Sequence, residues 1–313
     1  MSYFPSIVGQ DKAKMRLGFY LEKHPQSRFV PNIVFIAPKG CGKTLIAKAF
    51  AKNLLSQEKK DTPKDYVEIN CAQIKNVKHF FHSIISPYVL DKEVTVLFDE
   101  ASELPADVQM ALLSIINPNQ EKSNAFTFED FTFNFDFLKQ TFLFATTEAQ
   151  DLNHALLDRL VRVDLEPYSF SHLASILASK LQGITFEDGV LEQIASVLRG
   201  NGRQAQLMAN DILSFLSASK SKNFTAANWE SLKRSLSINP FGLNDIEIQI
   251  LKILAERGSC SLTHLSAVTG LTRECLQKDF EMYIQKLGLM EIRTVKGRTL
   301  SSKGQAYIRS LNV

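Results

Sequence analysis

The sequence predicts an α/β fold in which a three-layer domain with a parallel sheet is followed by an all-α domain and a winged helix. Short apolar runs alternate with helical stretches over residues 1–167, and only the helical period persists over 168–238. Three expected helices and two alternating segments then fill residues 239–313. A chain of 313 residues also exceeds what one hydrophobic core usually organises. We therefore expect domain boundaries near residues 167 and 238.

Four short apolar runs are expected to form the parallel sheet of the first domain. Helical stretches alternate with these runs, and runs of this length are typical of strands that helices bury on both faces. The runs comprise residues 33–37, 94–98, 142–145 and 161–165.

Residues 168–238 are expected to form the all-α domain, because they show the helical period alone. The dipeptide Asn239-Pro240 interrupts this pattern and marks a linker. The expected helices cover residues 173–181, 189–198, 203–215 and 226–236.

The carboxyl-terminal part has the pattern of a winged helix. Asn244 and Glu247 have nearly the spacing of a capping box, which predicts that a helix begins there. Thr272 is expected to cap another helix. The expected elements are helices at 246–257, 262–268 and from Thr272 to about 287, and strands at 290–295 and 299–300 around the turn 296–298.

The strongest chemical signal is a glycine-rich segment between the first expected strand and the helix after it. It reads Ala-Pro-Lys-Gly-Cys-Gly-Lys-Thr and ends at Thr44. Backbone N–H groups at such a helix N-terminus bind phosphate, and Gly40 and Gly42 let the backbone approach closely. Lys43 is expected to reach the β- and γ-phosphates, and the Thr44 hydroxyl to complete magnesium coordination. The pattern has glycine where this chain has Ala37, whose Cβ would be strained at a positive φ.

Two acidic residues follow the second apolar run. Asp99 is expected at the carboxyl edge of the sheet, beside the phosphate loop, where its carboxylate can hold Mg²⁺. Glu100 is then placed to act as the general base toward an attacking water. The two motifs together predict ATP and Mg²⁺ as ligands.

Composition excludes several classes of protein. With 45 % hydrophobic and 22 % charged residues, the chain is neither disordered nor fibrous. No apolar run approaches the ~20 residues of a membrane span and no signal-peptide pattern is present, so a cytoplasmic location is expected. The four cysteines lack the C-x-x-C spacing of zinc sites, and we expect reduced thiols.

Positive charge is concentrated at the carboxyl end of the chain. Residues 239–313 contain ten Lys or Arg and seven Asp or Glu, a surplus equal to the net charge of +3 of the whole chain. The basic side chains of residues 286–313 can contact phosphate, or they can form an ordinary solvated face. Charge alone leaves both alternatives open.

An aromatic-rich segment predicts a β-hairpin. Residues 126–137 read Phe-Thr-Phe-Glu-Asp-Phe-Thr-Phe-Asn-Phe-Asp-Phe, a two-residue period with a turn at Glu129-Asp130. Six phenylalanines on one face of a hairpin need cover. They can pack on the core of this chain, or they can dock a partner or a neighbouring subunit, which we favour.

The order of these motifs resembles AAA+ ATPases, and within them the family of the RuvB motor of Holliday-junction branch migration. The resemblance implies a P-loop AAA+ domain with a helical lid, and ATP hydrolysis in a ring, by analogy a hexamer. It covers nearly the whole chain through short segments in the same order. These segments are residues 4–10, the two motifs above, and residues 145–147, 156–160, 200–203, 242–244 and 293–298.

The resemblance implies roles for residues around the nucleotide. Residues 4–10 look like the segment that flanks the adenine, with Ile7 and Val8 in it. Tyr168 matches a tyrosine that contacts the adenine. Thr147 matches the sensor that positions the lytic water, and Arg159 is similar to an arginine finger that acts on a neighbouring subunit. Arg203 resembles the second sensor, whose movement closes the lid. The six residues with these implied roles are Ile7, Val8, Thr147, Arg159, Tyr168 and Arg203.

The resemblance also implies partners. The segment 293–298 looks like the wing of the DNA-binding domain, with Arg293, Lys296 and Arg298 as DNA-binding residues. In the family, a hairpin before the first sensor strand contacts the junction-binding protein RuvA. The hairpin 126–137 is therefore expected to meet a RuvA-like partner.

Two other functions remain as alternatives. A clamp-loader or helicase-loader ATPase has the same core, although the winged helix favours the branch-migration type. A DNA-binding regulator with a nucleotide fold as scaffold is disfavoured, because it does not need the catalytic set. That set comprises Lys43, Thr44, Asp99, Glu100, Arg159 and Arg203.

Overall fold

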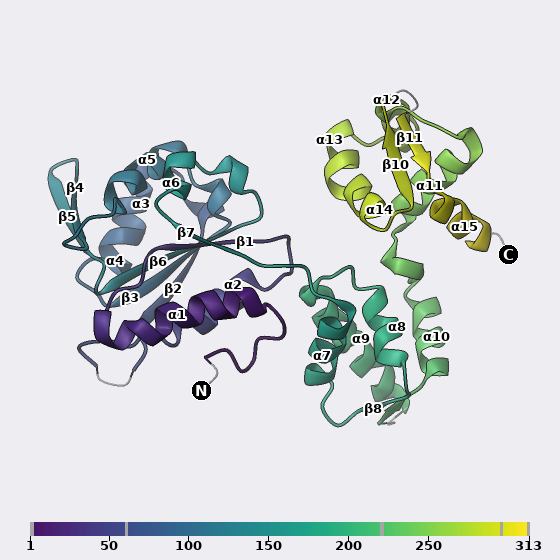
Figure 1. Ribbon diagram of the computed structural model, residues 1–313, viewed down its shortest axis with the longest axis horizontal. Helices are drawn as coiled ribbons and strands as arrows, with labels where there is room; N and C mark the ends of the chain where they lie inside the picture. Colours follow the sequence, from purple (N-terminus) through teal and green to yellow (C-terminus); the bar gives the residue numbers. More distant parts are fainter. Residues whose placement is uncertain (1–2, 60–61, 220–221, 295–296, 312–313) are drawn as a thin grey trace. The chain divides into compact units, whose positions relative to one another are not determined.

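The computed structural model describes residues 3–59, 62–219, 222–294 and 297–311 (Figure 1). The chain divides into two compact units. The first comprises Met1–Ile184 and Gly200–Lys222, and the second comprises Thr185–Arg199 and Asn223–Val313. The chain thus crosses between the units three times, and the expected boundaries at 167 and 238 stay predictions.

A five-stranded parallel sheet forms the centre of the first unit, in the order β2-β3-β6-β1-β7. The four expected strands are confirmed. The fifth, β2, was not predicted, because its side chains are exposed or half-buried at the sheet edge and include Asp65 and Glu68. The strands are β1 (Ile33–Ile36), β2 (Asp65–Asn70), β3 (Val94–Asp99), β6 (Gln140–Thr146) and β7 (Val161–Asp164).

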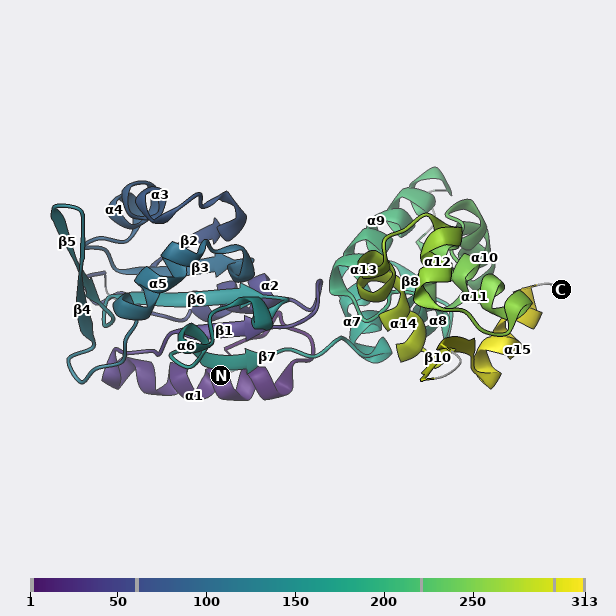
Figure 2. The ribbon, with the colours of Figure 1, turned by 90° about the horizontal axis from the view of Figure 1, so that it is seen from above.

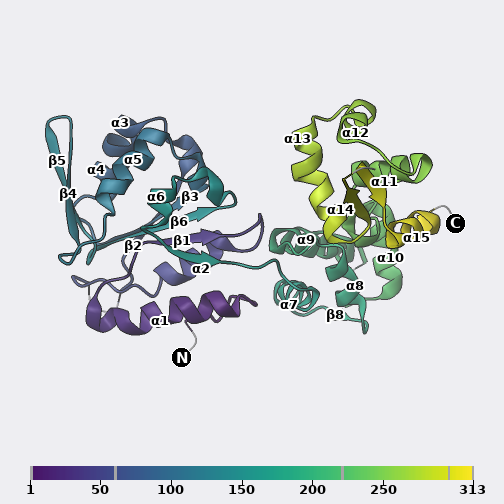
Figure 3. The ribbon, with the colours of Figure 1, turned by 45° about the horizontal axis from the view of Figure 1, so that its top comes forward.

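Helices cover both faces of this sheet, which gives the three expected layers (Figure 3). Helices α1 (Asp11–Ser27) and α2 (Lys43–Ala51) pack on one face, where Phe35 and Leu97 are buried. Val34 and Phe98 point to the other face and join a second cluster. The elements on that side are α3 (Val77–Phe80), the π-helical turn η2 (Phe81–Ile85), α4 (Ser86–Tyr88), α5 (Ala106–Ile115) and α6 (His154–Leu157).

The expected hairpin is confirmed at the amino-end edge of the sheet, away from the phosphate loop (Figure 2). Strands β4 (Ser123–Phe128) and β5 (Phe131–Asp136) pair antiparallel, and Glu129 has a left-handed φ of 52° in the turn. Its aromatic face, however, is covered by this chain. Phe81 stacks on three hairpin rings at centroid distances of 4.7–5.3 Å, those of Phe126, Phe128 and Phe133.

The interpretation of the whole aromatic face as a docking surface is therefore wrong, because η2 already covers it. Phe133, Phe135 and Phe137 are buried in the second cluster, the one that holds Val34 and Phe98, whereas Phe131 at the hairpin tip is 61 % exposed. Of the six phenylalanines, Phe131 at the tip is the one that is exposed.

Two helices complete the first unit. Helix α7 (Phe170–Lys180) packs against α9 (Gly202–Ser219), and Ser169 caps α7 by accepting a hydrogen bond from the His172 N–H. The described part of this unit also contains the 3₁₀ turns η1 (Cys71–Gln73), η3 (Ala101–Glu103) and η4 (Ala149–Asp151).

The second unit contains the winged helix (Figure 1). Asn244 and Glu247 form the expected capping box at the start of α11 (Asp245–Arg257), and Thr272 caps the third helix as expected. The 3₁₀ turn η5 (Pro240–Gly242) precedes them. The other elements are α12 (Leu262–Thr269), α13 (Arg273–Cys275), the π-helical turn η6 (Leu276–Glu281), α14 (Met282–Lys286), β10 (Met290–Arg293), β11 (Gly297–Leu300) and α15 (Ser302–Leu311).

The second unit also holds α8 (Val190–Ser196) and α10 (Ala226–Ser235), so the four helices expected over 168–238 are all present. One feature of that part was not predicted. Residues Thr185–Phe186 (β8) and Asn223–Phe224 (β9) pair as a short parallel bridge, too short to leave a two-residue period in the sequence. Among the helices described, none is long and apolar enough to cross a membrane.

Candidate nucleotide site and DNA-binding wing

The phosphate loop connects β1 to α2 in a conformation that leaves the helix N-terminus open. Gly40 and Gly42 have left-handed φ values of 79° and 88°, which only glycine adopts readily. Gly42 is the N-cap of α2 and offers no side chain to its N–H groups, so those donors remain available to an anion. Ala37 does not have a positive φ, and its N–H donates to the Thr146 carbonyl across 3.3 Å. The Ala37 departure from the pattern is therefore accommodated without backbone strain.

The Lys43 ammonium is held inside this loop. Its Nζ donates to the Ala37 carbonyl across 2.7 Å and to the Pro38 carbonyl across 3.3 Å. Burial lowers the pKa of Lys43, and the nearby positive charge of Arg203 acts in the same direction, while Asp99 opposes it. A partly desolvated cation with carbonyl partners, beside open N–H groups, fits a phosphate chain.

The two sequence motifs meet at the carboxyl edge of the sheet. The Thr44 hydroxyl donates to Oδ2 of Asp99 across 2.9 Å. The other carboxylate oxygen, Oδ1, accepts a hydrogen bond from the Glu100 N–H across 3.0 Å. A hydroxyl next to a carboxylate is the ligand pair that Mg²⁺ uses together with phosphate oxygens and water. The residues present therefore fit a magnesium–nucleotide complex.

Glu100 has an unusual backbone conformation. Its φ of 55° and ψ of 47° are left-handed, although it is not glycine. Non-glycine residues in this region are strained and cluster at functional sites. The side chain of Glu100 is exposed beside Asp99, which suits a base that receives a proton from water.

Thr147 lies between the two motifs in the sheet. Strand β6 separates β1 from β3, and Thr147 is the exposed residue directly after it. The preceding Thr146 is buried, and its Oγ1 accepts from the Glu148 N–H across 3.0 Å. Of the two threonines, Thr147 is therefore the one whose side chain is exposed at the carboxyl edge of the sheet.

The segment before Arg203 lies directly on the phosphate loop. The Gly202 N–H donates to the Gly40 carbonyl across 2.9 Å, and a Cβ added at Gly40 would lie 1.9 Å from Oδ1 of Asn201. A Cβ added at Gly42 would lie 2.7 Å from the hydroxyl of Tyr168. The structure thus places Tyr168, Asn201 and Gly202 against the loop, and Arg203 directly follows Gly202. Asn201 and Gly202 were not singled out in the sequence as contacts of the loop.

Gln10 attaches the N-terminal segment to the phosphate loop and to the residue before Pro167. Gln10 belongs to the segment 4–10 but was not singled out in the sequence. Its Nε2 donates to the Glu166 carbonyl across 2.7 Å, and its Oε1 accepts from the Glu166 N–H across 3.0 Å. Gln10 has a left-handed φ of 59°, which no sequence pattern predicts. Ile7 is buried in the core below α1 and α2, whereas Val8 is half-buried. Of this pair, only Val8 has a partly exposed side chain.

Arg159 lies on the side of the sheet that carries α5 and α6. Its Nε donates to Oδ1 of Asn117 across 3.2 Å, and its Nη1 donates to the Ala155 carbonyl across 2.6 Å. These contacts hold the guanidinium near the end of α6, and its hydrogen bonds are with these residues rather than with Thr44 or Asp99. Such a placement suits a residue that acts on another subunit.

The wing corrects one expectation about DNA. Arg298 is only 9 % exposed, and its guanidinium forms two hydrogen bonds with Glu281, of 2.6 and 2.9 Å. A guanidinium that is buried and paired with a carboxylate does not reach a DNA phosphate, so its assignment as a DNA-binding residue is wrong. Arg293 is exposed and pairs with Glu291 across 3.0 Å at the surface. Lys296 lies outside the described residues.

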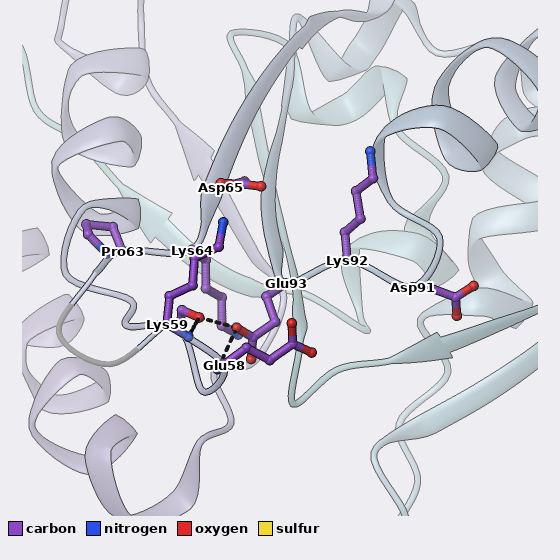
Figure 4. Close-up of a pocket in the computed structure, with 9 residues that line it drawn as sticks. Glu58, Lys59, Pro63, Lys64, Asp65, Asp91, Lys92 and Glu93 are labelled. Carbon is purple, nitrogen blue, oxygen red and sulfur yellow. Dashed lines mark hydrogen bonds between the residues drawn. The ribbon is translucent and has the colours of Figure 1, made fainter.

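A pocket of about 250 Å³ lies at the opposite, amino edge of the sheet (Figure 4). Two of its charged groups have partners within the chain: Glu93 accepts hydrogen bonds from the N–H groups of Gln57 and Glu58, and Lys64 donates to the Leu138 carbonyl across 2.8 Å. None of the predicted site residues lines it. The lining residues are Ser56, Glu58, Lys59, Pro63, Lys64, Asp65, Asp91, Lys92 and Glu93.

Comparison with known families matches two parts of the chain. Residues 33–168 match the model of the ATPase family associated with various cellular activities (AAA). Residues 240–309 match the model of the RuvB C-terminal winged helix domain.

Similar proteins match along almost the whole chain. The Holliday junction branch migration complex subunit RuvB of Neorickettsia sennetsu is 22 % identical over 98 % of this chain and 91 % of its own length. The RuvB subunit of Campylobacter fetus is 26 % identical over 96 % of this chain and 86 % of its own. The solved structure of the Thermotoga maritima RuvB Holliday junction branch migration motor has a TM-score of 0.76 at 23 % identity, covering 96 % of this chain and 95 % of that one. Because both domain models and the full-length relatives agree, the chain belongs to the RuvB family of AAA+ ATPases.

Proposed function

We propose that this protein is an ATP-hydrolysing motor that moves four-way DNA junctions. The observation that carries the proposal is the hydrogen bond between Thr44 and Asp99, which joins the phosphate loop to the acidic strand end beside Glu100. The names of the full-length relatives support the junction as substrate. The family matches at 33–168 and 240–309 support three functional parts, with boundaries near 167 and 238.

In the proposed reaction, the backbone N–H groups from Gly40 to Thr44 and the Lys43 ammonium bind the phosphates of ATP. Thr44 and Asp99 hold Mg²⁺, which neutralises charge that develops on the phosphates. Glu100 accepts the proton of the attacking water, and Thr147 orients that water. Tyr168 and Val8 border the base, while Arg203 approaches the phosphates from the lid.

The proposed assembly is a ring of identical subunits, by analogy with six members. Its support within the chain is the position of Arg159, whose guanidinium hydrogen-bonds Asn117 and Ala155 on the α5–α6 side of the sheet. In a ring, Arg159 reaches the γ-phosphate bound by the neighbour, and hydrolysis needs the assembled interface.

Two surfaces are proposed to meet other molecules. Arg293 on β10 contacts DNA phosphates, which positions the wing without reading sequence. The exposed tip of the hairpin at Phe131 meets a RuvA-like junction-binding protein, a narrower contact than the aromatic face first suggested. The cytoplasmic location expected from the sequence stays a prediction.

A junction assay tests the proposal directly. Purified protein, ATP and Mg²⁺ are mixed with a synthetic four-way junction, and strand dissociation and phosphate release are followed together. The proposal predicts ATP-dependent dissociation that is absent with Lys43→Ala. Phosphate release stimulated by primer–template DNA but not by the junction would favour the loader alternative, and no phosphate release with any DNA would favour the regulator.

A further inference from the structure

A buried ion pair attaches one residue of the segment before α9 to the winged helix. Glu247, in the first turn of α11, is fully buried and accepts two hydrogen bonds from the Arg199 guanidinium, of 2.7 and 3.2 Å. The same carboxylate caps α11 by accepting from the Asn244 N–H across 2.9 Å. Arg199 itself lies outside the winged-helix sequence, directly after α8.

An aromatic ring holds the other side of this guanidinium. The Arg199 guanidinium carbon lies 3.8 Å from the centre of the Tyr283 ring, a stacking geometry that adds to the ion pair. The Tyr283 hydroxyl donates to the Phe241 carbonyl across 2.7 Å, which fixes the ring in turn. Arg199 is therefore bound by α11 and α14 together.

The backbone next to Arg199 is also held by this unit. A Cβ added at Gly242 would lie 2.0 Å from the Val197 carbonyl oxygen, so the two backbones are in close contact. Arg199 has a left-handed φ of 57°, a conformation that persists in a non-glycine residue only where its surroundings determine it. The ion pair and the stacked ring are those surroundings.

The residues that follow belong to the nucleotide unit, because the division between the two compact units falls between Arg199 and Gly200. The Gly200 carbonyl accepts from the Tyr168 N–H across 3.1 Å, and the Gly202 N–H donates to the Gly40 carbonyl in the phosphate loop. Only two residues, Gly200 and Asn201, thus separate the anchor at Arg199 from the anchor at Gly202, a distance of three residue steps along the chain. A chain of three residues spans at most ~10 Å, so the Gly202 end cannot move far without pulling on Arg199.

We propose that Arg199 is a positioning residue that transmits the nucleotide state of the phosphate loop to the winged helix. Nucleotide binding changes the contacts of residues 200–203, and the Arg199–Glu247 pair carries that change to α11. This inference rests on the proposed function, since it assumes that the protein binds both ATP and DNA. It adds the residue pair through which one site acts on the other.

Binding affinities measure this coupling without relying on turnover. Affinity for ATPγS is determined with and without saturating four-way junction, and the ratio of the two dissociation constants is the coupling factor, which must be the same for both ligands. In the wild type we expect a factor of about 10 or more. The decisive variant combines Arg199→Met with Glu247→Gln.

This double variant removes the ion pair without leaving a buried charge, and glutamine still serves a capping box. Its coupling factor should fall to about 2 or less, while each ligand alone binds with an affinity within about threefold of wild type. Arg199→Lys keeps the charge but loses the two-point and stacking geometry, so it should give an intermediate factor without loss of folding.

The matched control is the pair Arg298→Met with Glu281→Gln, another ion pair of the winged helix with a buried glutamate, whose side-chain hydrogen bonds join Arg298 to Glu281 and do not involve residues 200–203. At saturating junction this control should keep the wild-type coupling factor. Wild-type coupling in both Arg199 variants overturns the inference. If the wild-type protein fails to bind ATPγS or the junction, or binds them without any coupling, that result contradicts the proposed function instead.

Discussion

Thr44 and Asp99 are 55 positions apart in the chain, and the hydroxyl of the first donates to Oδ2 of the second across 2.9 Å. Asp99 ends β3, whereas Thr44 lies in the first turn of α2, after the loop that follows β1. Strand β6 lies between β1 and β3, so the contact depends on β1, β6 and β3 being parallel and ending at one edge. The phosphate loop, the Thr44–Asp99 pair and Thr147 all lie at this edge of the sheet. The first prediction follows from that pair.

Asp99→Asn should weaken Mg²⁺ binding, because a neutral amide replaces the only carboxylate of the Thr44–Asp99 pair. Loss of even an outer partner of a metal ligand costs ~10–100-fold in affinity, so the Mg²⁺ concentration that gives half-maximal ATP hydrolysis should rise by at least about tenfold. Magnesium titration of the ATPase measures it. An unchanged midpoint would remove Asp99 from the metal site.

Arg159→Ala should bind ATP normally and hydrolyse it about 10³-fold more slowly, as expected for an arginine finger. In mixtures with wild type, activity should fall faster than the wild-type fraction, because each variant subunit disables its neighbour. The control is Arg162→Ala, an exposed arginine that pairs with Asp164 on β7. A linear decline in the mixing experiment would argue against action between subunits.

The two arginines of the wing should behave differently. Arg293→Ala should leave folding intact and reduce the slope of log affinity for DNA against log salt by about one, the effect of one lost phosphate contact. Arg298→Ala should instead destabilise the winged helix by about 3–5 kcal/mol, because Glu281 is left buried without its partner. Salt titrations and thermal unfolding separate the two, and a stable Arg298→Ala protein with a reduced salt slope would restore Arg298 to the DNA surface.

Lys64 should make stability depend on pH. Its side chain is 3 % exposed, and burial lowers its pKa from 10.5 to about 8, with Glu93 and Asp136 opposing the shift. Since the folded pKa lies below the unfolded one, the unfolded chain binds more protons between about pH 8 and 10.5. The free-energy cost of burying the charged Lys64 ammonium is thus fully present below about pH 8 and disappears as the pH rises to 10.5, so the free energy of unfolding increases over this range.

Denaturant unfolding of the wild type and of Lys64→Met at several pH values measures this effect as a difference. The wild type should gain at most about 3 kcal/mol relative to the variant between pH 8 and 10.5. Burial also raises the pKa values of Cys71 and Tyr66 in the folded protein, and because both proteins contain these groups, their contributions cancel in the difference. Parallel curves for the two proteins would show that folding does not lower the pKa of Lys64.

Local chemistry made several elements predictable. The capping box of Asn244 and Glu247 and the left-handed glycines of the phosphate loop depend on residues close in sequence, and both are present. The apolar runs of the central strands are equally direct, because strands buried on both faces need apolar side chains throughout.

Features decided by distant partners were not predictable in this way. Arg298 looked like a basic wing residue, and only its contact with Glu281 on η6 shows that it is buried. The hairpin looked uncovered, because its cover is Phe81, far away in the sequence. Gln10 acts through hydrogen bonds to Glu166, and Asn201 through its close approach to Gly40, and neither contact has a periodic signature in the sequence.

Separate measurement of ATP binding and ATP hydrolysis in Glu100→Gln tests the central claim most directly. The amide cannot accept the proton of the attacking water, whereas the phosphate loop and Asp99 are unchanged. We expect ATP affinity within about threefold of wild type, single-turnover hydrolysis slower by about 10²-fold or more, and no movement of a four-way junction. Wild-type hydrolysis by Glu100→Gln, or junction movement at the wild-type rate without hydrolysis, would contradict an ATP-driven motor with Glu100 as its base.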